Sequence, residues 1–234
     1  ERKKLYQWFF NITKFANNLL IDLDELKGWP EKVKLMQKNW IGKSLGCEID
    51  FQISSTQDKI KIFTTRPDTI FGVSFLTIAP EYEDISELSS SNNKSSIKKY
   101  ISEVSKKTER DRLTDVKTVS GVFSGSYAIH PFNGKRIPIW ISDYVIASYG
   151  TGAVMGVPAG DQRDFDFAKK FQIDIPNIFK NIDISKAAFS DKFEAWIAQP
   201  GNDKKYEDDF KDSTCADYLR NNIKKEFSSA VGSP

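Results

Sequence analysis

The sequence predicts a mixed α/β fold, a small domain built on an antiparallel, barrel-like β-sheet with surrounding helices and preceded by a helical arm. Two observations carry this prediction. Residues 5–26 repeat apolar side chains at helical spacing, whereas from residue 47 onward short runs alternate polar and apolar side chains with a period of two. In the middle of the chain these short runs outnumber the helical segments. We therefore expect a helical arm over residues 1–38 and a second domain over residues 39–234.

The arm contains two predicted helices with broad apolar stripes. The first spans residues 5–26 and ends at Gly28 and Pro30, which both stop helices. The second is the stretch EKVKLMQKNWIG, residues 31–42. Stripes this wide need a larger apolar surface to pack against, so we expect the arm to dock on a further part of the protein.

The second domain begins with strands. EIDFQI and KIKIFTT, residues 48–53 and 59–65, predict a pair, and VSFLTIAP, residues 73–80, predicts another strand. Residues 86–96 are polar and of low complexity, which predicts a loop. The apolar spacing over residues 97–104 then predicts an amphipathic helix.

A hairpin, a glycine-rich segment and a helix follow. GVFSGSYAIHPFNGKRIPIWISDYVI, residues 121–146, predicts two strands that turn at residues 133–134. GTGAVMGV, residues 150–157, predicts a strand or loop punctuated by glycine, and DQRDFDFAKKF, residues 161–171, predicts a helix. Residues 176–234 carry no readable functional signal.

Composition excludes several classes of protein. With 34 Lys and Arg against 32 Asp and Glu, the net charge of +2 does not indicate a nucleic-acid binder, although a local basic surface stays open. Cys47 and Cys215 are isolated, so we expect no structural zinc site and a reducing compartment. No run reaches the ~18 apolar residues of a membrane span, and the start is not that of a signal peptide. His130 stands alone before a proline in a turn, which predicts a surface residue and no Ser-His-Asp triad.

The glycine-rich segment does not match a phosphate loop. A Walker loop needs Lys-Ser/Thr after its last glycine, and none is present. A dinucleotide-binding fingerprint needs its glycines to lead directly into a helix, but Pro158 and Gly160 intervene. We expect these glycines to let the backbone approach another strand or a ligand closely. A small-nucleotide-binding domain stays an alternative if a parallel strand precedes the segment.

Two acids mark the start of the helix after this segment. Asp161 is a natural N-cap and Asp164 falls at the third helical position, an arrangement like a capping box that needs no function to explain it. A carboxylate at the positive end of a helix is also favoured in its charged form. We expect both to be ionised at neutral pH, which suits an anchor for a substrate cation better than a general base. Asp166 is expected to be solvated.

The stretch FTTRPDTIFG places hydroxyl groups and a guanidinium group where a strand breaks. Ordinary turn chemistry explains Pro67 and Asp68. Thr64, Thr65 and Arg66 are individually consistent with strand and surface positions. Clustered at a strand end, however, these groups are also what a sugar-phosphate site requires.

Four strings resemble the editing domain of bacterial or organellar leucyl-tRNA synthetases. They are TTRPDTIFGVSFLTIAPEY, YGTGAVMGVPAGDQRDFDFAKKF, GVFSGSYAIHPFNGKRIPIWISDYV and LKGWPEKVKLMQKNWIGKSLG. The likeness runs from about Leu5 to Ile175 and implies an inserted domain with its helical flank. Such domains hydrolyse wrong esters on tRNA(Leu), because one methylene group changes binding by only ≈ 1–3 kcal/mol. The His-Ile-Gly-His and Lys-Met-Ser-Lys-Ser signatures of the synthetic site are absent, so no synthetic activity is expected.

The resemblance also implies roles for individual residues. Asp164 would bind the α-ammonium group of the misattached amino acid, with Asp161 assisting beside it. Thr69 would refuse leucine by its bulk. Water, positioned by threonines, backbone and a ribose hydroxyl without metal or other cofactor, would cleave the ester.

Other pocket residues and the partners follow in the same way. Thr64, Thr65 and Arg66 would surround the terminal adenosine and the attacking water. The resemblance assigns the pocket wall to Tyr149, Met155 and Val157. The implied partners are the acceptor end of mischarged tRNA(Leu) and the remainder of the synthetase, for a monomer in a bacterial cytosol or an organelle and not in a membrane.

Gly160 departs from the family pattern, which usually has histidine between Ala159 and Asp161. The loss of an imidazole predicts slower hydrolysis or looser positioning of the adenosine, without a change of substrate class. It also leaves an alternative open, in which the domain binds the tRNA acceptor end with weakened or lost hydrolysis.

Overall fold

The structure is a computed structural model. It describes residues 6–8, 10–43, 46–114, 119–147, 150–179 and 183–189. Contacts between residues divide the chain into two units, with the boundary between residues 45 and 46. The first unit is helical and the second contains the β-sheet, and each is described by itself.

The helical unit begins with a 3-10 helix, η1 (Ile12–Phe15), followed directly by α1 (Ala16–Asp22). The prediction of one long helix over residues 5–26 is therefore wrong within the described part. What the sequence shows as one continuous apolar stripe is two short helical segments.

The second helix of this unit, α2 (Glu31–Ile41), confirms the prediction. It ends at Gly42, whose φ of 60° is left-handed, as is common after the last turn of a helix. The helices line an open pocket of about 420 Å³, whose walls are mainly apolar side chains. Much of the unit's apolar surface remains exposed, including Trp8, Phe10 and Trp40.

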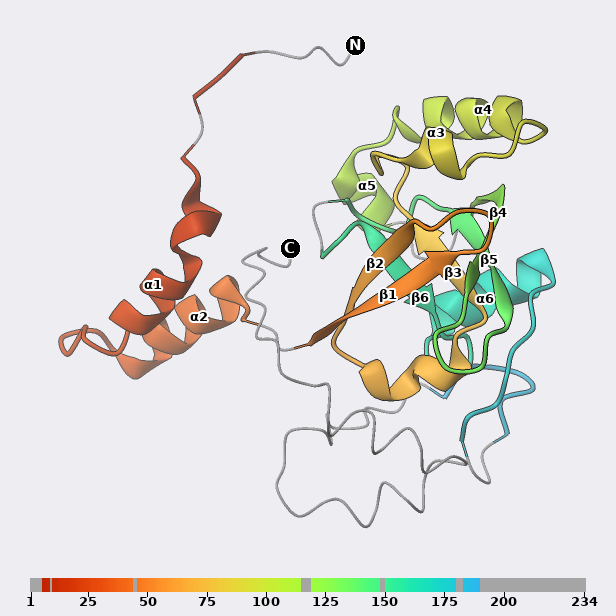
Figure 1. The fold of residues 1–234 in the computed structure, drawn as a ribbon. Helices are drawn as coiled ribbons and strands as arrows, with labels where there is room; N and C mark the ends of the chain where they lie inside the picture. The colour runs from red at the N-terminus through yellow and green to blue at the C-terminus, as the bar shows by residue number, and fades with distance from the viewer. Residues whose placement is uncertain are drawn as a thin grey trace. The chain divides into compact units, whose positions relative to one another are not determined.

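Six strands form one sheet in the second unit (Figure 1). In chain order they are β1 (Cys47–Ile53), β2 (Lys59–Thr64), β3 (Phe75–Ile78), β4 (Val122–Ile129), β5 (Arg136–Ile141) and β6 (Ala153–Gly156). Their order across the sheet is β2-β1-β4-β5-β3-β6. The mixed α/β class and the predicted strands and hairpin are confirmed.

The sheet differs from the predicted antiparallel barrel in two ways. β3 and β5 pair in parallel, while the other ladders are antiparallel. The outer strands β2 and β6 lie against each other, but no ladder joins them in the described chain, so the barrel is not closed. We call this junction between β2 and β6 the seam. The parallel pair requires a long connection between its strands, and that connection carries helices and β4.

Helical segments surround the sheet. They are η2 (Pro67–Gly72), α3 (Ile85–Leu88), α4 (Lys94–Val104), α5 (Glu109–Thr114) and α6 (Gln162–Phe171). α4 confirms the predicted amphipathic helix, but α3 occupies part of the predicted loop because Ile85 and Leu88 are buried. Across the described residues, the structure contains no helix with the length and apolar character needed to cross a membrane.

Two apolar clusters lie on opposite faces of β3. Leu76 and Ile78 belong to the main core, whereas Phe75 packs with α6 in the smaller cluster. The rings of Phe75 and Phe167 stack with centroids 5.0 Å apart. Because side chains alternate along a strand, Thr77 faces the α6 side together with Phe75.

Candidate functional site

The threonine-rich and glycine-rich segments meet at the seam. A Cβ added to Gly150 would lie 3.3 Å from the Cβ of Phe63 in β2. A Cβ added to Gly72, the last residue of η2, would lie 3.0 Å from Cγ1 of Val157. The expectation that the glycines allow close approach to another segment is therefore confirmed.

In the threonine-rich segment, two hydroxyl groups fix the turn at Arg66. The hydroxyl oxygen of Thr64 accepts the Arg66 N–H at 3.0 Å, and the Thr69 hydroxyl donates to the Arg66 carbonyl at 2.8 Å. The Arg66 guanidinium donates to both carboxylate oxygens of Asp68, at 3.0 and 2.9 Å. Thr65 is therefore the exposed threonine of this segment, and its hydroxyl has no hydrogen-bond partner among the described residues.

His130 holds this segment from the interior. It is 1% exposed, so the prediction of a surface residue is wrong. Its Nδ1 accepts the N–H groups of Phe132 and Asn133, which leaves the proton on Nε2 to be donated to the Ile70 carbonyl at 2.9 Å. Burial lowers the pKa of His130 and keeps it neutral. The imidazole thus joins η2 to the turn between β4 and β5.

At the start of α6 the two acids have separate roles. Asp161 is the N-cap, as predicted, and its carboxylate accepts the N–H groups of Arg163 and Asp164 at 2.8 and 3.1 Å. Asp164 does not return a bond to the Asp161 N–H, as a capping box would. Its two oxygens accept instead the N–H of Val157 at 2.8 Å and the hydroxyl of Tyr144 at 3.0 Å.

The expectation that Asp164 is fully ionised at neutral pH does not hold. Its pKa is raised to about 7, chiefly because burial takes the carboxylate out of water, and the negative charge of Asp161 adds to this. The bonds from Val157 and Tyr144 and the positive charge of Arg163 lower the pKa, but by less. The helix N-terminus does not compensate for the lost solvation, so Asp164 titrates near neutral pH.

Val157 connects the acidic and threonine-rich parts of the site. Its N–H binds Asp164, while its side chain packs against the end of η2. Within the described chain, Asp164 makes no hydrogen bond with Thr64, Thr65 or Thr69. Val157 is therefore the residue through which the start of α6 and the threonine-rich segment are connected.

The remaining predicted site residues lie in different environments. Met155 and Val157 are buried in the main core, and Asp166 is exposed on α6, as expected. Gly160 has room for a side chain, since an added Cβ would have its nearest contact at 3.6 Å. Tyr149 lies outside the described residues. Two residues that the sequence reasoning missed, His130 and Tyr144, hold the two motifs in place.

The local topology excludes the nucleotide-binding alternative. β6 pairs with β3 in antiparallel fashion, and α6 begins only at Gln162, beyond Pro158. A dinucleotide fingerprint needs a parallel strand that leads directly into its helix. In the same described residues, no group of three or more His, Cys, Asp and Glu side chains could hold a metal ion.

Comparison with known proteins identifies the family. The family model for the editing domain of leucyl-tRNA synthetase matches residues 38–216. A leucine–tRNA ligase of Christiangramia forsetii is 53% identical over 197 residues, which cover 84% of this chain and 20% of the relative. One of Borreliella burgdorferi is 55% identical over 175 residues, covering 75% of this chain and 21% of the relative.

A solved structure has the same fold. It is the leucyl-tRNA synthetase of Agrobacterium radiobacter K84 in a ternary complex with tRNA and LeuAMS, 35% identical with a TM-score of 0.65. The match covers 78% of this chain and 22% of that one. The chain thus spans about a fifth of the length of its relatives. It belongs to the leucyl-tRNA synthetase family, in which it corresponds to the editing domain.

Proposed function

We propose that this domain hydrolyses the ester bond of tRNA(Leu) that carries an aliphatic amino acid other than leucine. Water adds to the ester carbonyl, the bond to the ribose oxygen breaks, and that oxygen takes a proton. No step in this proposal uses a metal or another cofactor. The family of the chain supports the reaction class, and the observation that carries the site assignment is the contact of Val157 with both motifs.

Each motif has a distinct task in the proposal. Asp164, in its ionised form, binds the α-ammonium group of the amino acid, since a buried carboxylate interacts strongly with a cation. Thr65 positions the attacking water, because Thr65 is exposed whereas the hydroxyl groups of Thr64 and Thr69 are bonded to Arg66. Thr69 is buried and rigidly held, as a residue that excludes leucine by its bulk must be.

The proposed partners are the acceptor end of tRNA and the rest of a synthetase. The solved relative that binds tRNA supports the first. The second is supported by the exposed apolar surface of the helical unit, including Trp8 and Trp40, and by relatives about five times as long as the matched part.

The alternative is a module that binds the tRNA end without hydrolysing it. Gly160 favours this alternative, because the resembled family has an imidazole at that position. The two functions differ in one measurable quantity, the lifetime of the ester.

The half-life of Ile-tRNA(Leu) tests the proposal. We expect the wild-type chain to shorten it relative to buffer, and Asp164→Asn to lengthen it by about 100-fold relative to wild type, because the ammonium anchor is lost. Asp166→Asn is the matched control, since Asp166 is an exposed acid of the same helix that binds Gln162. It should leave the half-life unchanged, and Leu-tRNA(Leu) should be spared by all three proteins.

Two outcomes would contradict the proposal. The first is a wild-type chain that binds tRNA while the ester half-life stays equal to that in buffer, which would support the binding module. An active wild type that Asp164→Asn leaves unaffected removes Asp164 from the site.

A further inference from the structure

Tyr144 is the side chain that contacts the Asp164 carboxylate in the described part of the chain. Its hydroxyl lies 3.0 Å from Asp164 Oδ1 and 3.2 Å from the Thr77 hydroxyl of β3. A tyrosine has one hydroxyl proton, and an ionised Asp164 can only accept it. Thr77 must then donate to Tyr144. The result is a directed chain of hydrogen bonds that runs from Thr77 through Tyr144 to Asp164.

The ring of Tyr144 is held from two sides by α6. The guanidinium carbon of Arg163 lies 5.8 Å from the ring centroid, within the range of a cation–π interaction. The ring of Phe167 packs edge-on, with centroids 5.8 Å apart and planes at 71°. These contacts restrict the ring so that its hydroxyl meets Asp164.

The backbone on both sides of Tyr144 is held by one buried arginine. Arg112 donates from Nε to the carbonyl of Asp143 and from Nη2 to the carbonyl of Val145, each at 2.6 Å. Its Nη1 pairs with Glu81 at 2.7 Å. Because both neighbours of Tyr144 are fixed by the same planar group, the position of Tyr144 is set from outside α6.

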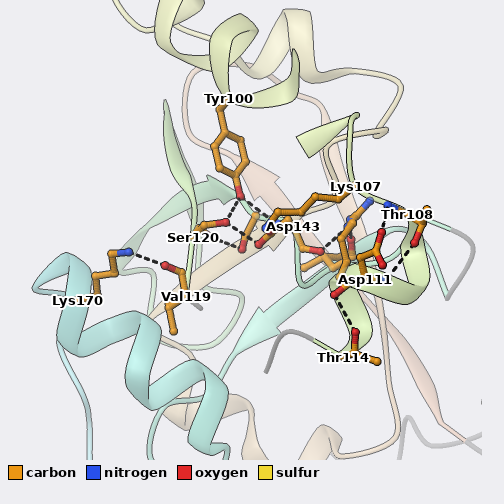
Figure 2. A network of polar contacts seen from close by, with 12 residues as sticks. Tyr100, Lys107, Thr108, Asp111, Thr114, Val119, Ser120, Asp143 and Lys170 are labelled. Atoms are coloured by element: carbon orange, nitrogen blue, oxygen red, sulfur yellow. Dashed lines mark hydrogen bonds and ion pairs between the residues drawn. The ribbon is translucent and has the colours of Figure 1, made fainter. Parts of the chain in front are cut away.

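The side chain of Asp143 adds a second set of supports (Figure 2). Its carboxylate accepts hydrogen bonds from the Ser120 hydroxyl at 2.6 Å and from the Lys107 ammonium at 3.0 Å, and the backbone N–H of Asp143 donates to the Tyr100 hydroxyl at 3.0 Å. Burial raises the pKa of Tyr100 to about 12, so this hydroxyl stays protonated. The segment before Tyr144 is thus fixed by three contacts independent of Asp164.

We propose that Tyr144 is a positioning residue of the editing site, whose hydroxyl aims the Asp164 carboxylate and favours its ionised form. The inference rests on the proposed role of Asp164 as the anchor for the substrate's ammonium group. Tyr144 touches neither substrate nor water in this account. It acts through Asp164, and Arg112 and Thr77 act through Tyr144.

The direction of the effect follows from the groups around Asp164. Those that act on it are Asp161, Arg163 and Tyr144, with Val157 contributing a backbone N–H. Removal of the Tyr144 hydroxyl leaves the other three unchanged and takes away a bond that stabilises the charged form. The titration midpoint of Asp164 should therefore rise, by about one pH unit for a hydrogen bond to a charged group.

Tyr144→Phe tests this directly, since it keeps the ring and removes the hydroxyl. The measurement is the titration of the Asp164 side-chain carbon by NMR on ¹³C-labelled chain, assigned by the signal that Asp164→Asn removes. We expect the midpoint to rise by about one unit, and Thr77→Val to give a smaller rise. In deacylation assays, Tyr144→Phe should be about eightfold slower at pH 6.5 and close to wild type at pH 8.5.

Tyr100→Phe is the matched control, because it removes a partly buried tyrosine hydroxyl from the Asp143 network instead. It should lower stability and leave the Asp164 midpoint where it is. An unchanged midpoint in folded Tyr144→Phe and Thr77→Val, or equal shifts in Tyr144→Phe and Tyr100→Phe, overturns the inference. The NMR titration needs no activity. A shifted midpoint in a chain that hydrolyses no ester would therefore reject the proposed function and keep the link between Tyr144 and Asp164.

Discussion

At the scale of single residues, the buried carboxylate of Asp164 lowers the stability of the fold and at the same time suits the binding of an ammonium group. A carboxylate buried to 7% exposure loses most of its solvation, and its two bonds to Val157 and Tyr144 do not restore it. The same lack of water makes an ion pair with an incoming ammonium group stronger. Such a pairing would itself lower the pKa of Asp164, so binding and ionisation support each other.

A first prediction at this scale concerns stability as a function of pH. Folded Asp164 holds its proton up to about pH 7, whereas in the unfolded chain the pKa is near 3.8. Between these values the folded state binds more protons, so the contribution of Asp164 to the unfolding free energy falls as pH rises. Asp164→Asn should therefore be more stable than wild type at pH 8, by about 1–4 kcal/mol, with the difference shrinking toward pH 4.

Urea unfolding of both proteins at pH 4.5 and pH 8 checks this. Asp166→Asn again serves as the control and should show no such trend, because Asp166 is exposed. A stability difference between Asp164→Asn and wild type that does not depend on pH would mean that Asp164 is ionised in the folded chain throughout this range.

The sequence predicted the location of these residues better than their state. Asp161 was identified as the N-cap because capping depends on a spacing of a few residues. The prediction that Asp164 is ionised at neutral pH failed because the pKa of this carboxyl depends on burial by residues distant in the sequence, and no local spacing reveals such burial. Tyr144 and His130 were missed for the same reason. Their partners lie 20 and 60 residues away in the chain.

At the scale of secondary-structure elements, η2 depends on contacts from outside itself. It spans six residues of 3-10 helix, a form with poor hydrogen-bond geometry that rarely persists alone. The carbonyl of Ile70 within it accepts the proton of His130, which is anchored in the turn after β4. The position of Thr69, one residue earlier, thus depends on the β4–β5 hairpin, 60 residues further along the chain.

Substitution of His130 tests this tie. His130→Ala should lower the unfolding free energy by about 2–4 kcal/mol, because a buried carbonyl and two N–H groups lose their partner and a cavity forms. His130→Gln should lose less, since its amide can still donate to Ile70. Both variants should also slow ester hydrolysis, and Ala more than Gln, because η2 carries Thr69.

The pH dependence gives an independent check. His130 has a lowered pKa when folded, so the unfolded chain binds more protons below its value of 6.5. The free energy of unfolding of wild type, taken relative to that of His130→Gln, should therefore fall between pH 7.5 and pH 5.5, because both proteins share the opposite contribution of Asp164. Ala and Gln variants of equal stability would show that the bond to Ile70 contributes nothing.

The same scale shows which elements a sequence reveals. β1, β2 and the β4–β5 hairpin were predicted because period-two alternation and turn residues are local signals. The parallel pairing of β3 with β5 was not predicted, since the alternation of side chains within a strand does not indicate which other strand it pairs with. The predicted helix over residues 5–26 failed because an apolar stripe reports which face is buried and not whether the backbone is continuous.

At the scale of the whole molecule, the two hydrophobic clusters of the described residues both belong to the sheet unit. The sheet unit buries its own apolar clusters, whereas Trp8, Phe10 and Trp40 of the helical unit are 102%, 99% and 68% exposed. Exposed apolar area of this extent is typical of a surface that another part of a protein covers. That agrees with the proposal that the helical unit packs against the rest of a synthetase.

Removal of residues 1–45 separates the two contributions. The remaining chain should keep the unfolding midpoint of the sheet unit within about 2 °C and bind less of a dye that reports exposed apolar surface. Thermal unfolding followed by circular dichroism, together with dye fluorescence, measures both. A sheet unit that unfolds without residues 1–45 would show that the helical unit is part of its core.

The seam is the part of the sheet where two neighbouring strands can move relative to each other most easily. Backbone ladders join β1 to β2 and β3 to β6, whereas in the described chain no ladder joins the adjacent strands β2 and β6. A bound aminoacyl-adenosine that touched both Thr65 and Val157 would link the β2 side of the seam to the β6 side. Such a ligand would reduce the motion of β2 relative to β6, and part of its binding free energy would offset the cost of that ordering. Tighter binding and a more rigid sheet unit would therefore go together.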